Sequence, residues 1–226
     1  MVESLTLKLF ECKGGNIISA PEKRGLYNLA SDLHPLHWER LARRPPEISA
    51  RAAGCDLVEG CFHIDCVAKT LAIDPQRRAV VLRDEPGGEP GYQRSLAALT
   101  YLAGATEGPA SGAFVSPREL PGGASFFRGP HSLPTDRLAS AFGPDLPSLA
   151  AAAKALGGRI AQGGDLSFII PGLPKIPIQI VYWRGDEEFS AASALLVDAR
   201  SHLHLPLDAL WALLNVAVSS LTGRNH

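Results

Sequence analysis

The sequence lacks most of the features that would assign a protein of 226 residues to a functional class at first sight. Lysine and arginine number 22 against 23 aspartate and glutamate residues, so the net charge of −1 gives no general reason to expect nucleic acid or a membrane surface as a partner. No apolar run approaches the roughly 20 residues that a membrane-spanning helix needs. The N-terminus has no basic segment leading into an apolar signal core. We therefore expect a cytoplasmic protein.

Cysteines and familiar catalytic motifs are also scarce. Four cysteines do not make a disulfide-dense secreted scaffold, so reduced thiols are expected. No Cys-x-x-Cys pair is present, which argues against structural zinc. No Gly-x-Ser-x-Gly nucleophile elbow occurs, and no cysteine stands in a recognised catalytic context. The glycines match neither the phosphate-binding loop nor the dinucleotide fingerprint.

The pattern of apolar residues predicts the fold class. Short extended segments between residues 54 and 84 indicate an antiparallel meander. Helices are then expected over residues 92–103, 133–142 and 146–156. Strands over 167–170, 176–183 and 194–198 follow, and an amphipathic helix over 207–221 ends the series. This order predicts an α+β fold with an antiparallel meander, central helices, and a mixed or antiparallel sheet with a C-terminal helix.

The chain divides into a leader, residues 1–53, and a single α+β domain, residues 54–226. In the leader we expect a helix over residues 26–41, interrupted at Pro35 and ended by Pro45-Pro46. The sequence leaves open whether the leader packs on the domain. Residues 106–132 are rich in glycine and proline, and a loop of this length inside a compact domain is either functional or poorly ordered.

Several motifs follow one another in a fixed order in the second half of the chain. They are Leu99-Thr100-Tyr101-Leu102, Val115-Ser116-Pro117-Arg118-Glu119-Leu120-Pro121-Gly122-Gly123, Pro174-Lys175-Ile176-Pro177-Ile178 and Trp183-Arg184-Gly185-Asp186-Glu187-Glu188-Phe189. Together they resemble the domain-of-unknown-function family numbered 3786, found mostly in anaerobic bacteria and archaea, over roughly residues 54–221. Some members look like fusions to a four-cysteine iron–sulfur module of corrinoid proteins, a run that this chain lacks at its N-terminus. The resemblance implies anaerobic metabolism near corrinoids or other metal cofactors.

The acidic cluster Asp186, Glu187 and Glu188 follows an apolar segment that ends at Trp183. Carboxylates at the end of a strand can bind a metal ion or supply a general base. Adjacent residues of an extended chain point to opposite faces, so at most two of the three can converge on one site. The alternative is a polar turn in which one carboxylate holds a backbone or arginine partner.

The long loop supplies a second set of candidate ligand-binding residues. Arg118 and Glu119 precede Gly122 and Gly123, which permit close approach of a ligand to the backbone. An arginine here can bind a carboxylate or phosphate with two hydrogen bonds. Alternatively, Arg118 forms a structural salt bridge with Glu187 or with Asp165, itself a candidate ligand-binding residue.

Histidines and cysteines give candidate metal ligands in two places, Cys61-x-His63 and His202-x-His204. Alternate positions of a strand lie about 7 Å apart, so either pair needs further ligands from elsewhere in the fold. A histidine can also serve as an axial ligand of haem or cobalt, and His131 at the end of the long loop is another candidate. The alternative is that these are ordinary surface or core residues.

Aromatic residues could line an apolar pocket for a flat cofactor. The candidates are Phe126-Phe127, Tyr182-Trp183 and Trp211. At these spacings, however, aromatic residues are more often part of the core.

Three hypotheses for the function follow. The leading one is a non-catalytic binding protein for a small molecule or metal cofactor, such as a corrinoid, haem or a transition metal, with the 106–132 loop over the site. The second is a metal-assisted hydrolase or lyase that uses the acidic cluster with Arg118. The third is an adaptor that binds a protein partner through the leader or the C-terminal helix. No nucleic acid and no membrane are expected as partners.

Overall fold

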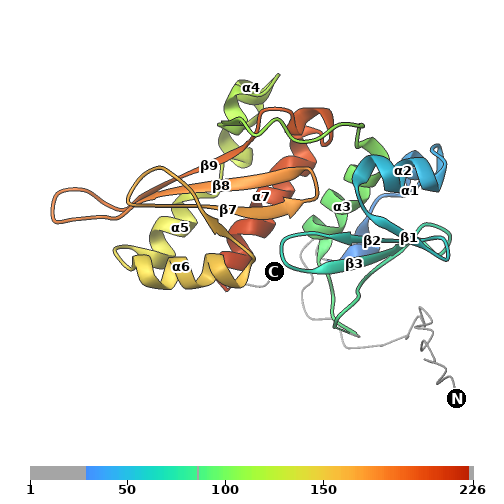
Figure 1. The fold of residues 1–226 in the computed structure, drawn as a ribbon, viewed down its shortest axis with the longest axis horizontal. Helices are drawn as coiled ribbons and strands as arrows, with labels where there is room; N and C mark the ends of the chain where they lie inside the picture. Colours follow the sequence, from blue (N-terminus) through green and yellow to red (C-terminus); the bar gives the residue numbers. More distant parts are fainter. Residues whose placement is uncertain (1–28, 86, 224–226) are drawn as a thin grey trace, which may run out of the picture.

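A computed structural model describes residues 29–85 and 87–223 of the chain; residues 1–28 of the predicted leader, residue 86 and residues 224–226 lie outside the described part. The described chain has an α+β fold with two antiparallel sheets, as predicted. A four-stranded sheet lies at one end of the long axis and a five-stranded sheet at the other, with helices α3 (Tyr92–Gly104) and α7 (Leu207–Leu221) between them (Figure 1). No helix in the described ranges has the length and apolar character needed to cross a membrane.

Two helices at the start of the described chain pack on α3. A short 3₁₀ turn at Ala30–Asp32 leads into α1 (Pro35–Ala42), so Pro35 begins a helix after an interruption. Helix α1 ends at Ala42, just before Pro45-Pro46, and Pro46 begins a further helix that was not predicted, α2 (Pro46–Ala53). Proline is favoured at the first position of a helix, where its missing N–H is not needed.

The predicted meander is the four-stranded sheet, in the order β1-β2-β3-β4. Its strands are Asp56–Val58, Cys61–Asp65, Thr70–Asp74 and Ala79–Leu82. Phe62 and Ile64 of β2 are opposite Ile73 and Leu71 of β3, and all four side chains are buried. This alternation sets one face of the meander against the core.

The second sheet has the order β5-β9-β8-β7-β6, and every neighbouring pair is antiparallel. Its strands in chain order are Phe114–Val115, Arg159–Ile160, Leu166–Leu173, Ile176–Trp183 and Ala192–Asp198. Helix α5 (Thr135–Phe142) contacts β9, while α6 (Leu146–Ala155) and α7 contact β7. Ile178, Ile180 and Tyr182 of β8 are completely buried.

The Gly/Pro-rich segment 106–132 contains several short elements. These are β5, a 3₁₀ turn at Pro117–Glu119, α4 (Gly123–Phe126) and a 3₁₀ turn at Gly129–His131. A further 3₁₀ turn, Ser201–Leu203, leads towards α7. Residues 106–132 therefore have local structure that their composition did not indicate.

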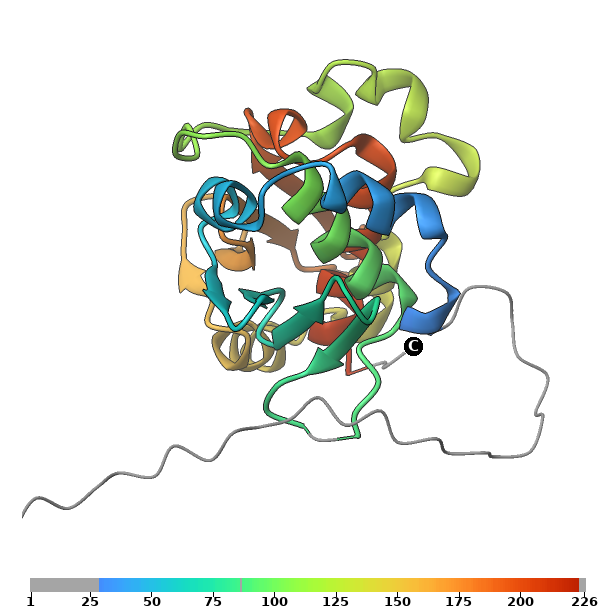
Figure 2. The ribbon, with the colours of Figure 1, turned by 90° about the vertical axis from the view of Figure 1, so that its right-hand side faces the viewer.

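Helices α3 and α7 run antiparallel to each other. Arg94 near the start of α3 bonds Ser220 near the end of α7, whereas Gly104 at the end of α3 approaches the backbone of His204, which precedes α7. Seen from the meander side, α3 lies beside the four-stranded sheet, with α7 behind it (Figure 2). The start of α3 and the end of α7 therefore lie side by side, next to the meander.

Candidate ligand-binding groove

A groove of about 760 Å³ lies between the first turns of α3 and one face of α7. This volume is within the range of small-molecule sites, roughly 300–1,000 Å³. Asp208, Trp211, Asn215 and Ser219 of α7 line it, at the three- and four-residue spacing of one helix face. Ala212, Val216 and Ser220 of α7 also line it. The rest of the lining comes from the meander, the start of α3 with the residues before it, α5 and the end of the 106–132 segment: Lys69, Leu82, Glu85, Glu89, Pro90, Gly91, Tyr92, Gln93, Arg94, Leu96, His131 and Arg137.

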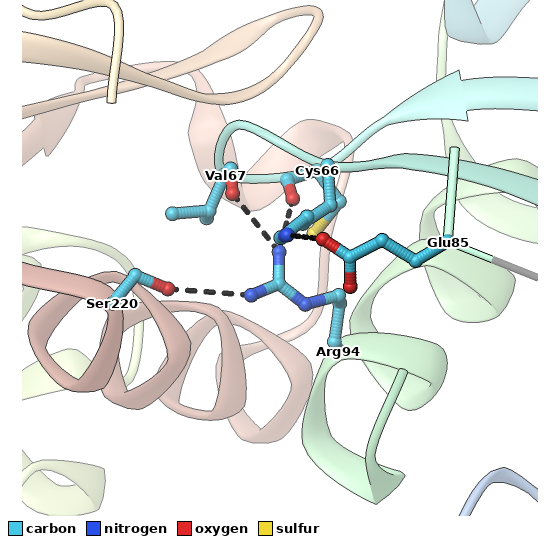
Figure 3. A network of polar contacts seen from close by, with 6 residues as sticks. Cys66, Val67, Glu85, Arg94 and Ser220 are labelled. Carbon is cyan, nitrogen blue, oxygen red and sulfur yellow. Dashed lines mark hydrogen bonds and ion pairs between the residues drawn. The ribbon is translucent and has the colours of Figure 1, made fainter. Parts of the chain in front are cut away.

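Arg94 closes the groove at the meander end. Its guanidinium donates from Nη1 to the carbonyl oxygens of Cys66 and Val67, the latter at 3.0 Å, and from Nη2 to Ser220 Oγ at 3.2 Å (Figure 3). Within the described ranges, every hydrogen bond of this side chain goes to an uncharged acceptor. The nearby Lys69 instead pairs with Glu85. The positive charge of Arg94 is therefore held in place without a carboxylate partner.

The two carbonyl groups that Arg94 binds belong to a strained two-residue hairpin between β2 and β3. Cys66 N and O bond Lys69 O and N at 2.8 and 3.3 Å, and the two residues between them have positive φ, 47° for Val67 and 57° for Ala68. This conformation favours glycine and asparagine, and a β-branched residue is disfavoured in it. Val67 N donates to Gly172 O at 2.9 Å, which holds the turn from the other side. Arg94 thus joins the turn to α3 and α7.

Arg137 approaches the same part of α7 from α5. It donates to Asn215 Oδ1 at 3.3 Å and to Ser219 Oγ at 2.8 Å. Ser219 and Ser220 are consecutive, so the two arginines reach one turn of α7 from different elements. Both guanidinium groups line the groove there.

The other end of the groove is aromatic. His131 stacks on Phe126, with 4.5 Å between the ring centroids, and meets Trp211 edge to face at 5.4 Å. Trp211 Nε1 donates to Ser132 O at 3.1 Å. The last residues of the 106–132 segment are thereby attached to α7, with His131 and Trp211 in the lining. Of the other aromatic candidates, Phe127 and Tyr182 are core residues and Trp183 is exposed on β8.

Cys66 is the cysteine next to the Arg94 network, and it does not resemble a nucleophile. Burial raises the pKa of its thiol to about 11, despite the opposing effect of Arg94. A thiol with this pKa is almost entirely protonated near neutral pH, whereas a reactive cysteine needs its thiolate. Cys66 therefore does not supply a nucleophile to this end of the groove.

The acidic cluster lies in the connection between β8 and β9, away from the groove. Asp186 Oδ1 accepts hydrogen bonds from the backbone N–H groups of Phe189 at 2.7 Å and Glu188 at 2.9 Å, and these bonds lower the pKa of Asp186. Asp165 Oδ2 likewise accepts from Arg184 N at 2.9 Å. Asp186 and Glu187 border a second hollow of about 650 Å³ between this connection and the end of α5. Backbone hydrogen bonds of this kind are typical of a polar turn.

Arg118 is not near the acidic cluster. It follows β5, which pairs with Val197 and Asp198 at the end of β9, whereas the cluster precedes the start of β9 at Ala192. The length of β9 separates the two by roughly 20 Å at about 3.3 Å per residue. Within the described ranges, no ion pair joins Arg118 to Glu187 or Asp165.

The neighbours of Arg118 have local structural roles. Glu119 Oε1 accepts from Ser116 N at 3.0 Å, and Ser116 Oγ accepts from Arg118 N at 3.3 Å. Gly122 has φ of 77°. A Cβ atom on Gly123 would overlap the carbonyl oxygen of Pro117. The two glycines are thus required by the turn itself.

The two predicted metal-ligand pairs occupy different places, Cys61 and His63 on β2 and His202 and His204 before α7. Across residues 29–85 and 87–223, no three His, Cys, Asp or Glu side chains form a group that could hold a metal ion. His202 Nδ1 contacts Ala199 O at 3.0 Å. His204 is buried with Nδ1 3.1 Å from Thr106 Oγ1, and burial followed by the charges of nearby basic groups lowers its pKa.

The sequence contained a signal for the groove that its interpretation overlooked. Arg94 is in the first turn of α3, where the helix dipole disfavours a cation. Ser219 and Ser220, like Asn215, are polar residues in a largely apolar helix. Such misplaced polar residues indicate a partner elsewhere in the fold, but the sequence does not show that the partners lie on α3, α5 and α7.

Residues 45–220 match the family described as Domain of unknown function (DUF3786). No curated protein and no solved structure matches the chain significantly. The match covers the meander, α3, α7 up to Ser220 and the whole five-stranded sheet. It includes Arg94, Arg137 and the face of α7 that lines the groove. The chain therefore belongs to the DUF3786 family.

Proposed function

We propose that this protein is a non-catalytic binding protein for a small molecule, which lies in the groove between α3 and α7. The observation that carries the proposal is Arg94, a cation in the lining whose described hydrogen bonds all go to uncharged acceptors. The size of the cleft is that of ligand sites, and its lining combines convergent polar and charged groups with apolar side chains.

The acidic cluster supports a hydrolase or lyase less well. Asp186 and Asp165 already accept backbone hydrogen bonds, and Arg118 lies at the opposite end of β9. A general base or a metal ligand needs a lone pair directed into the site. The groove is therefore the better candidate for the functional site.

Blocking the groove tests the proposal. Gln93 is half-buried in the lining, so Gln93→Trp should fill the space without replacing a core residue. Gln76→Trp is the matched control, because Gln76 is exposed in the turn after β3. Each protein is dialysed to equilibrium against a small-molecule extract, and the retained compounds are identified by mass spectrometry.

We expect the wild type and Gln76→Trp to concentrate the same compound and Gln93→Trp to lose it. Equal retention by all three proteins would place the ligand elsewhere. If no protein retained a compound, the proposed function would fail.

A tetrapyrrole such as a corrinoid or haem is a second candidate ligand, favoured by His131. This exposed histidine lines the groove beside Trp211, and an imidazole can be an axial ligand of iron or cobalt. Titration with haemin or hydroxocobalamin, followed by absorbance, should show a shifted spectrum that His131→Ala abolishes. His202→Ala is the control, and loss of the shift in that variant instead would place the ligand near η4 (Ser201–Leu203).

A further inference from the structure

We infer that the ligand of this groove is an organic acid, with its acidic group between Arg94 and Arg137 and its apolar body along α7 towards Trp211. This inference rests on the proposed function and adds the chemical class of the ligand. A carboxylate, phosphate or sulfonate shares the chemistry that two guanidinium groups recognise.

Arg94 and Arg137 converge on one turn of α7. They come from α3 and α5, which are far apart in the sequence, and they are anchored to consecutive hydroxyl groups, Ser220 and Ser219. An arginine anchored in this way loses little further conformational freedom when it binds an anion. The fold thus places two cations at one end of the groove.

Other charged groups surround the two arginines at this end of the groove. Lys69 and Glu85 form an ion pair and largely cancel each other. Arg94 bonds uncharged acceptors, and α3 begins here with Gly91 as its N-cap residue and no side chain capping it. A helix N-terminus adds partial positive charge to the field of the arginines. Two more carboxylates line the groove: Glu89 Oε1 accepts a hydrogen bond from Ala30 N at 2.9 Å, and Asp208 lies one helical turn before Trp211, towards the other end. At this end, the N–H groups of the two arginines are therefore the donors offered to an anion.

Further along α7, the lining includes apolar side chains. Ala212 and Val216 of α7, with Leu96 of α3, give an apolar wall that leads to the ring of Trp211. Trp211 and Ser219 are eight residues apart on α7, or about 12 Å at 1.5 Å per residue. An acidic group at one end and an apolar or aromatic body of this length would complement both parts of the groove.

Two fluorescent probes that differ in one group test this inference. The dye 8-anilinonaphthalene-1-sulfonate carries an acidic group, and N-phenyl-1-naphthylamine has the same rings without it. Both are titrated into the full-length wild type and into Arg137→Gln, Arg137→Lys and Gln93→Trp. Arg118→Gln is the control for loss of an exposed arginine outside the groove. Near-ultraviolet circular dichroism confirms that each variant retains its tertiary structure.

We expect Arg137→Gln to weaken binding of the sulfonate dye by about tenfold or more, as for loss of one charge-assisted hydrogen bond. Binding of the neutral dye should be unchanged, Arg137→Lys should restore part of the loss, and Arg118→Gln should behave as wild type. Gln93→Trp should abolish binding of both dyes.

Two results would overturn the account, and they are distinguishable. If Arg137→Gln weakened both dyes equally, or neither, the acidic class of ligand would be wrong while the groove remained a binding site. If Gln93→Trp left both dyes bound, the groove itself would not be the site, and the proposed function would fail as well.

Discussion

Arg94 lies in the first turn of α3, where the helix dipole disfavours a cation, yet it is bonded to two other parts of the fold, the turn after β2 and the end of α7. Its acceptors include both carbonyl groups at the start of the strained turn Val67-Ala68. Residues held in the left-handed region cost about 1–3 kcal/mol each and persist where their surroundings fix them. At this scale, one side chain stabilises an unfavourable turn and presents a positive charge to the groove.

Ala68 is the exposed residue of this turn, and replacing it with glycine should relieve the strain. Ala68→Gly should raise the free energy of unfolding by about 0.5–1 kcal/mol, because glycine adopts positive φ readily and this gain exceeds its extra loss of entropy. Urea unfolding measures the change. Ala151→Gly, at an exposed position within α6, is the control and should lower stability by about 1 kcal/mol. A loss of stability in Ala68→Gly would show that the turn is not strained.

At the scale of elements, α1 is attached to α3 by apolar packing. Trp38 and Leu41 are 5% and 2% exposed, and they belong to the main hydrophobic core. Two hydrogen bonds hold the neighbouring residues: Tyr101 Oη of α3 donates to Ala53 O at the end of α2 at 2.9 Å, and Arg44 Nη1, after α1, donates to Ala105 O, after α3, at 2.7 Å. The residues before the meander are therefore part of the core.

Truncation of the buried tryptophan tests this packing. Trp38→Ala should lower the free energy of unfolding by about 3–5 kcal/mol, the usual cost of a large cavity. Leu36→Ala on the same helix is the control, because Leu36 is 49% exposed and should change stability little. Thermal and urea unfolding of the two variants give the comparison. Equal, small effects would mean that α1 is not attached to the core.

The end of β9 is held by a buried carboxylate. Asp198 Oδ2 accepts from Ser111 Oγ and Gly112 N at 2.9 and 2.7 Å, and Oδ1 accepts from Arg200 N at 2.9 Å. Burial alone would raise the pKa of Asp198, but these hydrogen bonds outweigh it and lower the pKa. The folded state therefore favours the ionised form, and its stabilising effect is lost as the pH falls through the depressed pKa.

This linkage predicts a pH-dependent effect of Asp198→Asn. The variant should be less stable than wild type by about 1–3 kcal/mol at pH 7, the cost of losing hydrogen bonds to a charged group. The difference should shrink as the pH falls below the ordinary aspartate value of about 4, where the wild-type carboxylate becomes protonated. Asp84→Asn, at an exposed position, should show no such trend. A difference that stayed constant with pH would contradict the assignment.

The elements themselves were largely predictable, because their signals are local. The α7 boundaries, the strand 176–183 and the meander follow from apolar periodicity and turn residues. Helix α2 was missed because Pro45-Pro46 indicates an end and a beginning equally well. The groove was not predictable, since it depends on how α3, α5 and α7 are placed. Asp186, the most distinctive acidic residue of the sequence, forms a turn instead.

At the scale of the whole molecule, the two sheets are joined through the pair α3 and α7, and the groove lies along that pair (Figure 1). The meander supplies Lys69, Leu82 and Glu85 to the lining, and α5 beside the second sheet supplies Arg137. A ligand in the groove would contact both halves of the molecule. Binding should therefore raise the unfolding temperature of the whole protein.

The most direct test of the central claim is a crystal structure of the protein with 8-anilinonaphthalene-1-sulfonate bound. The account predicts density for the dye between α3 and α7, with sulfonate oxygens within hydrogen-bonding distance of Arg94 and Arg137, about 2.7–3.0 Å, and rings beside Trp211. Dye bound instead in the hollow beside Asp186 and Glu187, with the α3–α7 groove filled only by water, would contradict it.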